Sequence, residues 1–324
     1  MFKKSYIYKH NYLFFRFIRI FNCIDIIKQK ILLDEAKSVA DYKFQTNARF
    51  IMKFFKKMPA SSRGKNTLPP YDAADPEGIA AATLQQLENR LIPLIKNATV
   101  LKVKEATRLH PEAAFRSHFG GTPYFEQGDT WPVNKKGIPL QFVFQVFASP
   151  FAQLPAGVRL LQFFCPHITD IESFNVNECY VKLLTEFNPT RQVTLLAPSF
   201  ITPRPYCEII SDDALSLPDW QGLPLYSPEA VSIITALEPE EPWELYEQFC
   251  EKLTGNCYYR TQLAGYPRWI QQENTPINSK GKHSRLLFQV DSEDNAGLMW
   301  GDMGLVYVFY DQEKSTFWFE HQSH

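Results

Sequence analysis

The acidic residues between positions 291 and 302 come closest, in type and spacing, to a ligand-binding site. Four oxygen-bearing residues fall at positions 1, 3, 5 and 12 of a calcium-loop frame: Asp291, Glu293, Asn295 and Asp302. Ala296 stands where such a loop requires glycine, and the flanking residues have the pattern of strands rather than helices. We therefore predict no metal site here, and an ion- or phosphate-binding role for Asp291 and Asp302 is the alternative.

Known catalytic motifs are absent or incomplete. There is no Gly-x-Ser-x-Gly elbow, and Gly281-Lys282 is followed by His283 instead of the Ser or Thr of a phosphate-binding loop. His110 and Glu112 match half of a zinc deaminase signature whose Pro-Cys-x-x-Cys half is missing. The six cysteines include no Cys-x-x-Cys pair, which is typical of reduced thiols in a cytoplasmic protein. We predict no catalytic residue, metal or cofactor, and we favour a protein that is not an enzyme.

Charge is divided unevenly along the 324 residues. Residues 1–67 hold fifteen Lys or Arg and four Asp or Glu, so their net charge is +11 and that of the other 257 residues is −12. The apolar stretch 12–27 contains Arg16, Arg19 and Asp25, so it is too short and too charged to span a membrane. We predict that residues 1–70 form a basic extension that is disordered or not part of the domain. A basic helix on a membrane surface is the alternative.

The folded domain is predicted to cover residues 75–324 and to be mostly β. Pro76 follows a capping Asp75, and leucines at three- and four-residue steps then predict a helix that ends near Pro93. A second helix is predicted from Pro242 to Leu253, with a C-terminal stop at Gly255. The remaining apolar runs are short and separated by Pro, Gly, Asn and Asp, which predicts strands. These runs are 100–103, 142–147, 158–164, 180–184, 193–196, 286–290 and 305–310.

An internal repeat appears when the sequence is shifted by 144 residues. The triplet Phe144-Gln145-Val146 then falls on the identical triplet Phe288-Gln289-Val290, and glycines and prolines on both sides stay in step. The further matched pairs are Gly121 with Gly265, Pro123 with Pro267, Pro132 with Pro276, Gly157 with Gly301 and Leu161 with Leu305. We predict an α+β, internally duplicated antiparallel sheet domain with a few peripheral helices, whose two β-rich repeats cover about 119–165 and 263–310. The alternative is that the glycines and prolines of unrelated β-hairpins fall at similar positions by chance.

The ordered motifs of both repeats resemble the YwqG-like family of bacterial domains of unknown function. In the first repeat they are Phe119-Gly120-Gly121-Thr122-Pro123-Tyr124, Gly128-x-x-Trp131-Pro132, Pro139-Leu140-x-Phe142-x-x-Gln145 and Leu160-Leu161-Gln162-Phe163-Phe164. In the second they are Gly265-Tyr266-Pro267, Leu286-Leu287-Phe288-Gln289-Val290-Asp291-Ser292 and Met299-Trp300-Gly301-Asp302-x-Gly304. The match spans about residues 100–320, and the first 70 or so residues lie outside it.

The resemblance implies a mostly β, duplicated domain that is related to programmed-cell-death-protein-2-like and ribosome-maturation proteins. Those relatives bind and chaperone a ribosomal protein, and bacterial members have been proposed as immunity proteins of toxin systems. Some relatives carry a cysteine-pair metal site between the Trp-Pro and Pro-Leu elements. The corresponding segment here, Val133–Ile138, contains no cysteine, so we expect no metal there.

The candidate binding residues lie in two segments that combine glycine, tryptophan and acids: Gly120, Gly121, Trp131, Asp291, Trp300 and Asp302. The tryptophans are either core anchors or exposed contacts in a cleft. Four glutamines in apolar runs are either hydrogen-bonded core residues or the lining of a polar groove: Gln145, Gln162, Gln271 and Gln289. We predict a cytoplasmic module that binds another protein, a toxin or a ribosomal-type client, and not nucleic acid. The alternative is an enzyme that acts on nucleotides or RNA through an acidic site.

Overall fold

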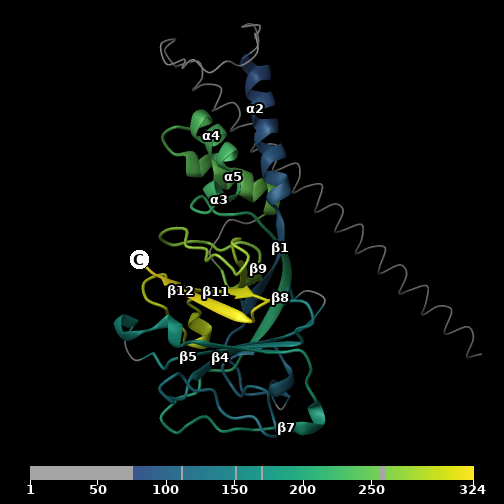
Figure 1. Cartoon of the computed structure of the whole chain (residues 1–324), viewed down its shortest axis with the longest axis vertical. Helices are drawn as coiled ribbons and strands as arrows, with labels where there is room; N and C mark the ends of the chain where they lie inside the picture. The colour runs from purple at the N-terminus through teal and green to yellow at the C-terminus, as the bar shows by residue number, and fades with distance from the viewer. Residues whose placement is uncertain (1–75, 111, 150–151, 169–170, 256–259) are drawn as a thin grey trace, which may run out of the picture. The chain divides into compact units, whose positions relative to one another are not determined.

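The structure is a computed structural model that describes residues 76–110, 112–149, 152–168, 171–255 and 260–324 (Figure 1). The chain divides into two units, Met1–Leu84 and Gln85–His324, and the second unit holds the whole sheet and every candidate residue. The predicted basic extension, residues 1–70, lies outside the described residues. In the ranges given above, no helix has both the length and the apolar character needed to cross a membrane.

The helices of the described part of the chain are α2 (Pro76–Leu91), α3 (Leu223–Tyr226), α4 (Pro228–Leu237) and α5 (Pro242–Thr254). The two predicted helices are confirmed as α2 and α5. α5 ends as its sequence indicates, because Gly255 adopts a left-handed conformation and its N–H donates to the carbonyl of Glu251 at 2.8 Å. α5 also contacts α4 and the longest strand, β8 (Cys207–Ser216).

Ten strands form one sheet in the order β12-β11-β10-β9-β1-β8-β2-β4-β5-β6, and its paired neighbours are antiparallel. β3 and β7 form a separate two-stranded pair. The remaining bounds are β1 Lys96–Val103, β2 His118–Phe119, β3 Phe125–Glu126, β4 Gln141–Phe147, β5 Leu160–Cys165, β6 Tyr180–Leu184, β7 Gln192–Val193, β9 Gln262–Ala264, β10 Arg285–Asp291, β11 Leu305–Asp311 and β12 Thr316–Gln322. The expected fold class, mostly β with a large antiparallel sheet and a few helices, is confirmed.

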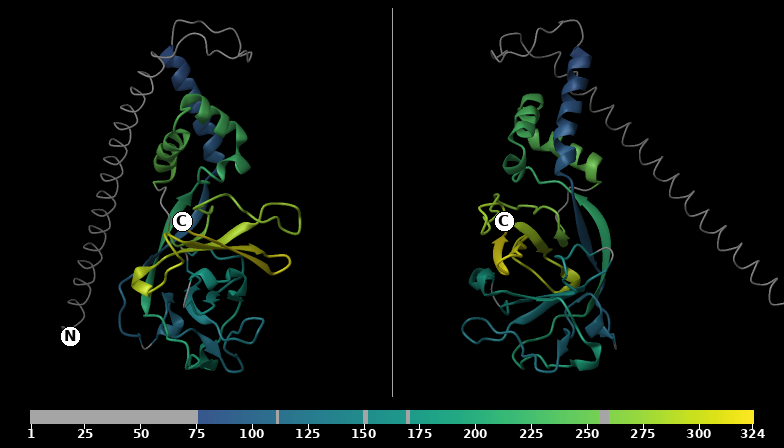
Figure 2. Two further views of the ribbon diagram at one scale, coloured as in Figure 1. Left: turned by 90° about the vertical axis from the view of Figure 1, so that its left-hand side faces the viewer. Right: turned by 45° about the vertical axis from the view of Figure 1, so that its right-hand side comes forward.

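One apolar core lies between the two halves of this sheet, which curves until it is nearly closed. Figure 2 shows the yellow strands β10 to β12 beside the blue-green strands β4 and β5 in both views. The ring of Phe288 on β10 lies 5.2 Å from that of Phe144 on β4 and 5.1 Å from that of Phe163 on β5, measured between ring centroids. The halves therefore stabilise each other by burying the same aromatic cluster.

The strands of the two halves correspond at the 144-residue offset. β10 covers the residues that match β4, and both strands have an irregular register at the matching place, between Phe142 and Phe144 and between Leu286 and Phe288. β1 and β8 pair with each other at the middle of the strand order, so that each half of the sheet extends outward from this pair. That the halves arose by duplication of one unit stays a prediction.

Candidate functional site

Gly120 and Gly121 follow β2 and have positive φ angles of +58° and +65°. A Cβ atom on Gly120 would lie 2.0 Å from the carbonyl oxygen of Pro205, so no other residue fits this backbone. The N–H of Gly121 donates to the carbonyl of Arg204 at 3.0 Å. These two glycines thus let the chain pass directly against the segment 204–205.

Buried glutamines hold the loops that follow these turns. The side chain of Gln145 accepts from the N–H of Tyr124 at 2.9 Å and donates to the carbonyl of Arg116 at 2.9 Å. Gln289 makes the matching bonds at the 144-residue offset, accepting from Arg268 N–H at 2.9 Å and donating to the Arg260 carbonyl at 2.8 Å. Both glutamine side chains are fully buried. They are hydrogen-bonded core residues and do not line a groove.

The two candidate tryptophans have different environments. Trp131 is half-buried, its Nε1 donates to the carbonyl of Leu140 at 2.7 Å, and its ring contacts Phe125 and Phe164. Trp300 is completely buried, and the centroid of its ring lies 5.3 Å from that of Phe174. Trp300 therefore belongs to the core between the sheet halves, and only its neighbours can contact another molecule.

Those neighbours belong to the 294–303 loop, which connects β10 to β11. Side chains alternate along it, with three buried ones at Ala296, Leu298 and Trp300. Met299 is 63% exposed and Met303 is 62% exposed, and Asp294 and Asp302 are also exposed. The loop thus presents two methionines and two carboxylates from a backbone whose other side is part of the core.

Hydrogen bonds fix the base of the 294–303 loop. The hydroxyl of Ser292 accepts from the N–H of Trp300 at 3.0 Å and donates to the carbonyl of Gly304 at 3.1 Å. The imidazole Nε2 of His321 lies 2.6 Å from the carbonyl oxygen of Trp300. The loop is therefore anchored by β12 as well as by residues at its own ends.

Arg204 brings the two candidate segments together. Its carbonyl accepts from Gly121, as described above, and its Nη1 donates to the carbonyl of Gly297 in the 294–303 loop. Trp131 is not part of this arrangement, because it packs into a separate cluster with Phe125 and Leu140. The structure therefore places Gly120 and Gly121 beside the 294–303 loop and Trp131 in another part of the domain.

Two carboxyl groups at the end of β10 have raised pKa values. Burial is the main cause for both, and it raises the pKa of Glu293 to about 7 and that of Asp291 above its ordinary value. The hydroxyl of Thr261 donates to Glu293 and partly offsets this effect. Asp302 is exposed. Within the described ranges no group of three or more His, Cys, Asp or Glu side chains is placed to hold a metal ion.

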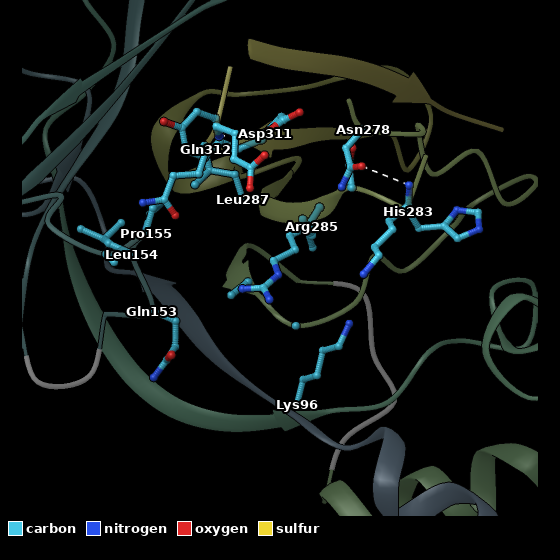
Figure 3. A pocket seen from close by; sticks show the side chains of 18 of the residues that line it. Lys96, Gln153, Leu154, Pro155, Asn278, His283, Arg285, Leu287, Asp311 and Gln312 are labelled. Carbon is cyan, nitrogen blue, oxygen red and sulfur yellow. Dashed lines mark hydrogen bonds between the residues drawn. The ribbon is translucent and has the colours of Figure 1, made fainter. Parts of the chain in front are cut away.

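An open pocket of about 1120 Å³ lies apart from this loop, beside the starts of β1 and β10 (Figure 3). Lys96, Lys282 and Arg285 are among the residues that line it. Sequence reasoning did not identify these residues as a site, because isolated basic residues on strands (Lys96, Arg285) or in a turn (Lys282) carry no motif. The signal that could have found them is the offset alignment, in which Arg285 falls on Gln141 and Lys282 on Ile138.

Comparison with family models identifies the family of this chain. The sequence profile of a domain of unknown function, DUF1963, matches residues 117–316. The chain belongs to this family. The DUF1963 match begins just before β2 and ends at the start of β12, so it includes the strands from β2 to β11 and the 294–303 loop, whereas β1 and most of β12 lie outside it. A comparison with curated proteins gave no match for the DUF1963 chain.

Proposed function

We propose that the chain is a YwqG-like protein with two duplicated repeats, related to the programmed-cell-death-protein-2-like proteins, and that it functions as a protein-binding module. Its role would be that of a toxin-immunity factor or of a chaperone-like binder of a client protein. The observation that carries this proposal is the 294–303 loop, which exposes methionines and carboxylates from a fixed backbone.

The methionines of this loop suit contact with a protein surface. A methionine side chain is flexible and polarizable, and such side chains are common at surfaces that adapt to a partner. Met303 also has a positive φ of +48°, a conformation that costs a residue with a side chain about 1–2 kcal/mol. Residues with strained backbone conformations cluster at active sites, ligand clamps and switch regions. It supports a role for the exposed Met303 side chain beyond packing.

The charge of the domain favours a basic protein segment as the partner. Asp294 and Asp302 lie on the exposed side of the loop, and residues 68–324 carry a net charge of −12. This field attracts cations and repels the phosphates of nucleic acid, and its effect weakens as salt screens it. We therefore propose a cytoplasmic protein partner with a basic contact segment, and neither nucleic acid nor a membrane.

Site-specific photocrosslinking in the native host tests this function. A photoreactive amino acid at Met299 of the full chain should crosslink to one dominant protein. Val133, which is 49% exposed on another hairpin, is the matched control position and should give no such product. The proposal fails if position 299 yields no specific product, or if position 133 crosslinks the same protein equally well.

An acidic enzyme site is the second candidate, and the raised pKa of Glu293 is the observation that favours it. A carboxyl group with a pKa of about 7 can serve as a general acid or base near neutral pH. Hydrolysis of mononucleotides and RNA by the full chain, lost in Glu293→Gln and retained in Glu320→Gln, would support this candidate over the binding module.

A further inference from the structure

Positive charge gathers in the pocket beside the starts of β1 and β10, although the domain as a whole is negative. Four cationic and two anionic side chains line it: Lys96, Lys280, Lys282, Arg285, Asp311 and Glu313. Figure 3 shows Lys96 and Arg285 extending from β1 and β10 toward the same open space. The pocket is therefore a local region of positive charge on an acidic domain.

The two acids of this pocket already have partners. The carboxylate of Asp311 accepts from the hydroxyl of Ser279 at 2.5 Å, from the N–H of Ser279 at 3.1 Å and from the N–H of Glu313 at 3.0 Å, and these bonds hold its pKa low. Glu313 forms an ion pair with Lys280. Three cations remain, and none of the ion pairs of the described residues includes Lys96, Lys282 or Arg285.

The positive charges of Lys96 and Arg285 repel each other. The ammonium group of Lys96 lies 3.8 Å from the centroid of the Tyr266 ring and 5.4 Å from that of Tyr226. Desolvation there, followed by the positive charge of Arg285, lowers the pKa of Lys96 to about 8. An anion bound beside both groups would offset this repulsion, and a pKa perturbed by burial together with a neighbouring charge is a feature of binding sites.

The corresponding hairpin of the other half shows that this turn does not require the cation Lys282. The side chain of Asn278 accepts from the backbone N–H groups of residues 280 and 282, and that of Asn134 accepts from those of residues 136 and 138. The two turns thus have the same hydrogen bonds at the 144-residue offset. The first turn has Ile138 where the second has Lys282, so the same backbone forms without this charge.

We propose that this pocket binds the dianionic phosphate group of a small phosphate monoester. A guanidinium group matches phosphate oxygens in a bidentate arrangement, and an ammonium group adds a second point charge. A dianion neutralises both Lys96 and Arg285, whereas a carboxylate or a phosphodiester neutralises only one charge. The ring of Tyr226, which is half-buried and also lines the pocket, provides an apolar surface for the ester group. The site is independent of the 294–303 loop.

Calorimetric titration of the full chain at pH 8 with phenyl phosphate and phenyl sulfate tests this proposal. Phenyl phosphate is a dianion at that pH, because the second pKa of phosphate esters is about 6, and phenyl sulfate is a monoanion of similar shape. We expect at least tenfold tighter binding of phenyl phosphate, and weaker binding of inorganic phosphate, which lacks the ring. Binding should take up protons, since the ligand raises the pKa of Lys96, and titrations in two buffers of different ionisation enthalpy measure this uptake.

The variant Arg285→Gln copies the residue at position 141 of the first half, and it should weaken phenyl phosphate binding at least tenfold. Lys282→Ile, which copies position 138, serves if Arg285→Gln does not fold. The control is Lys135→Gln, an exposed lysine on the first hairpin, which should bind as the parent does. Equal affinity for the two phenyl esters, unchanged binding by both pocket variants, or tighter binding of inorganic phosphate or of an oligonucleotide would each overturn the proposal.

Discussion

Replacement of Trp300 by alanine should destabilise the domain strongly. The Trp300 side chain has no exposed surface and lies against Phe163 and Phe174. A buried indole removes about 200 Å² from water, which at about 25 cal/mol per Å² corresponds to about 5 kcal/mol. Measured Trp→Ala losses in cores are about 3–5 kcal/mol, and we expect Trp300→Ala to fall in that range. The backbone bonds of Trp300 to Ser292 and His321 do not involve the indole, so the variant tests the side chain alone.

The assay is urea unfolding of the full chain, followed by circular dichroism, with the free energy of unfolding taken from the midpoint and slope. Trp300→Phe keeps most of the buried area and should lose only about 1–2 kcal/mol. Met299→Ala, which changes the exposed neighbour, should stay within about 0.5 kcal/mol of the parent. A loss below about 1 kcal/mol for Trp300→Ala would refute the conclusion that this ring is part of the core.

Three further outcomes are expected. Gly120→Ala should lower the free energy of unfolding by more than about 2 kcal/mol, because the added Cβ meets the backbone of Pro205. Gly137→Ala, whose Cβ meets nothing within 4 Å, should lower it by only about 1 kcal/mol. Urea unfolding of both variants tests this difference. Burial raises the pKa of Glu293 in the folded state, so the folded state binds the Glu293 proton more tightly than the unfolded state does. The contribution of Glu293 to the free energy of unfolding should therefore fall as pH rises from about 5 to 7. Glu293→Gln should remove that part of the pH dependence, and an unchanged pH profile of stability would contradict this prediction. Removal of residues 1–70 should shift the melting temperature by only a few degrees, since they lie outside the family match; loss of cooperative unfolding would show that they belong to the domain.

Strands with a clear apolar run bounded by turn residues could be predicted from the sequence. The run 180–184 coincides with β6, and β10 and β11 extend the predicted runs by a residue at one end or both. β8 was missed because its middle contains Asp212 and Asp213, which interrupt the apolar alternation. These acids are tolerated because that part of β8 is not buried, and Asp212 forms an ion pair with Lys102 of the paired strand.

The candidate site was predictable only in part. Glycine and tryptophan patterns indicated the two loop segments, but burial depends on tertiary packing, so the sequence could not separate the buried Trp300 from the half-buried Trp131. The link between the segments depends on Arg204, which is distant from both in sequence and belongs to no motif. The offset alignment indicates matched positions, and only the structure shows that the unmatched cation Arg285 lines the same pocket as Lys96.

The affinity of the crosslinked partner for variants of the 294–303 loop tests the central claim most directly. Dissociation constants should be measured for the full chain and for the double variant Met299→Ser/Asp302→Asn, both of whose changes are at exposed positions. The control is Val133→Ser, an exposed apolar residue on another hairpin. We predict at least tenfold weaker binding for the double variant, since contacts at the centre of an interface cost about 1–2 kcal/mol or more when truncated, and no change for the control. Equal dissociation constants for the parent and the double variant, with both proteins folded, would contradict the claim that this loop is the binding surface.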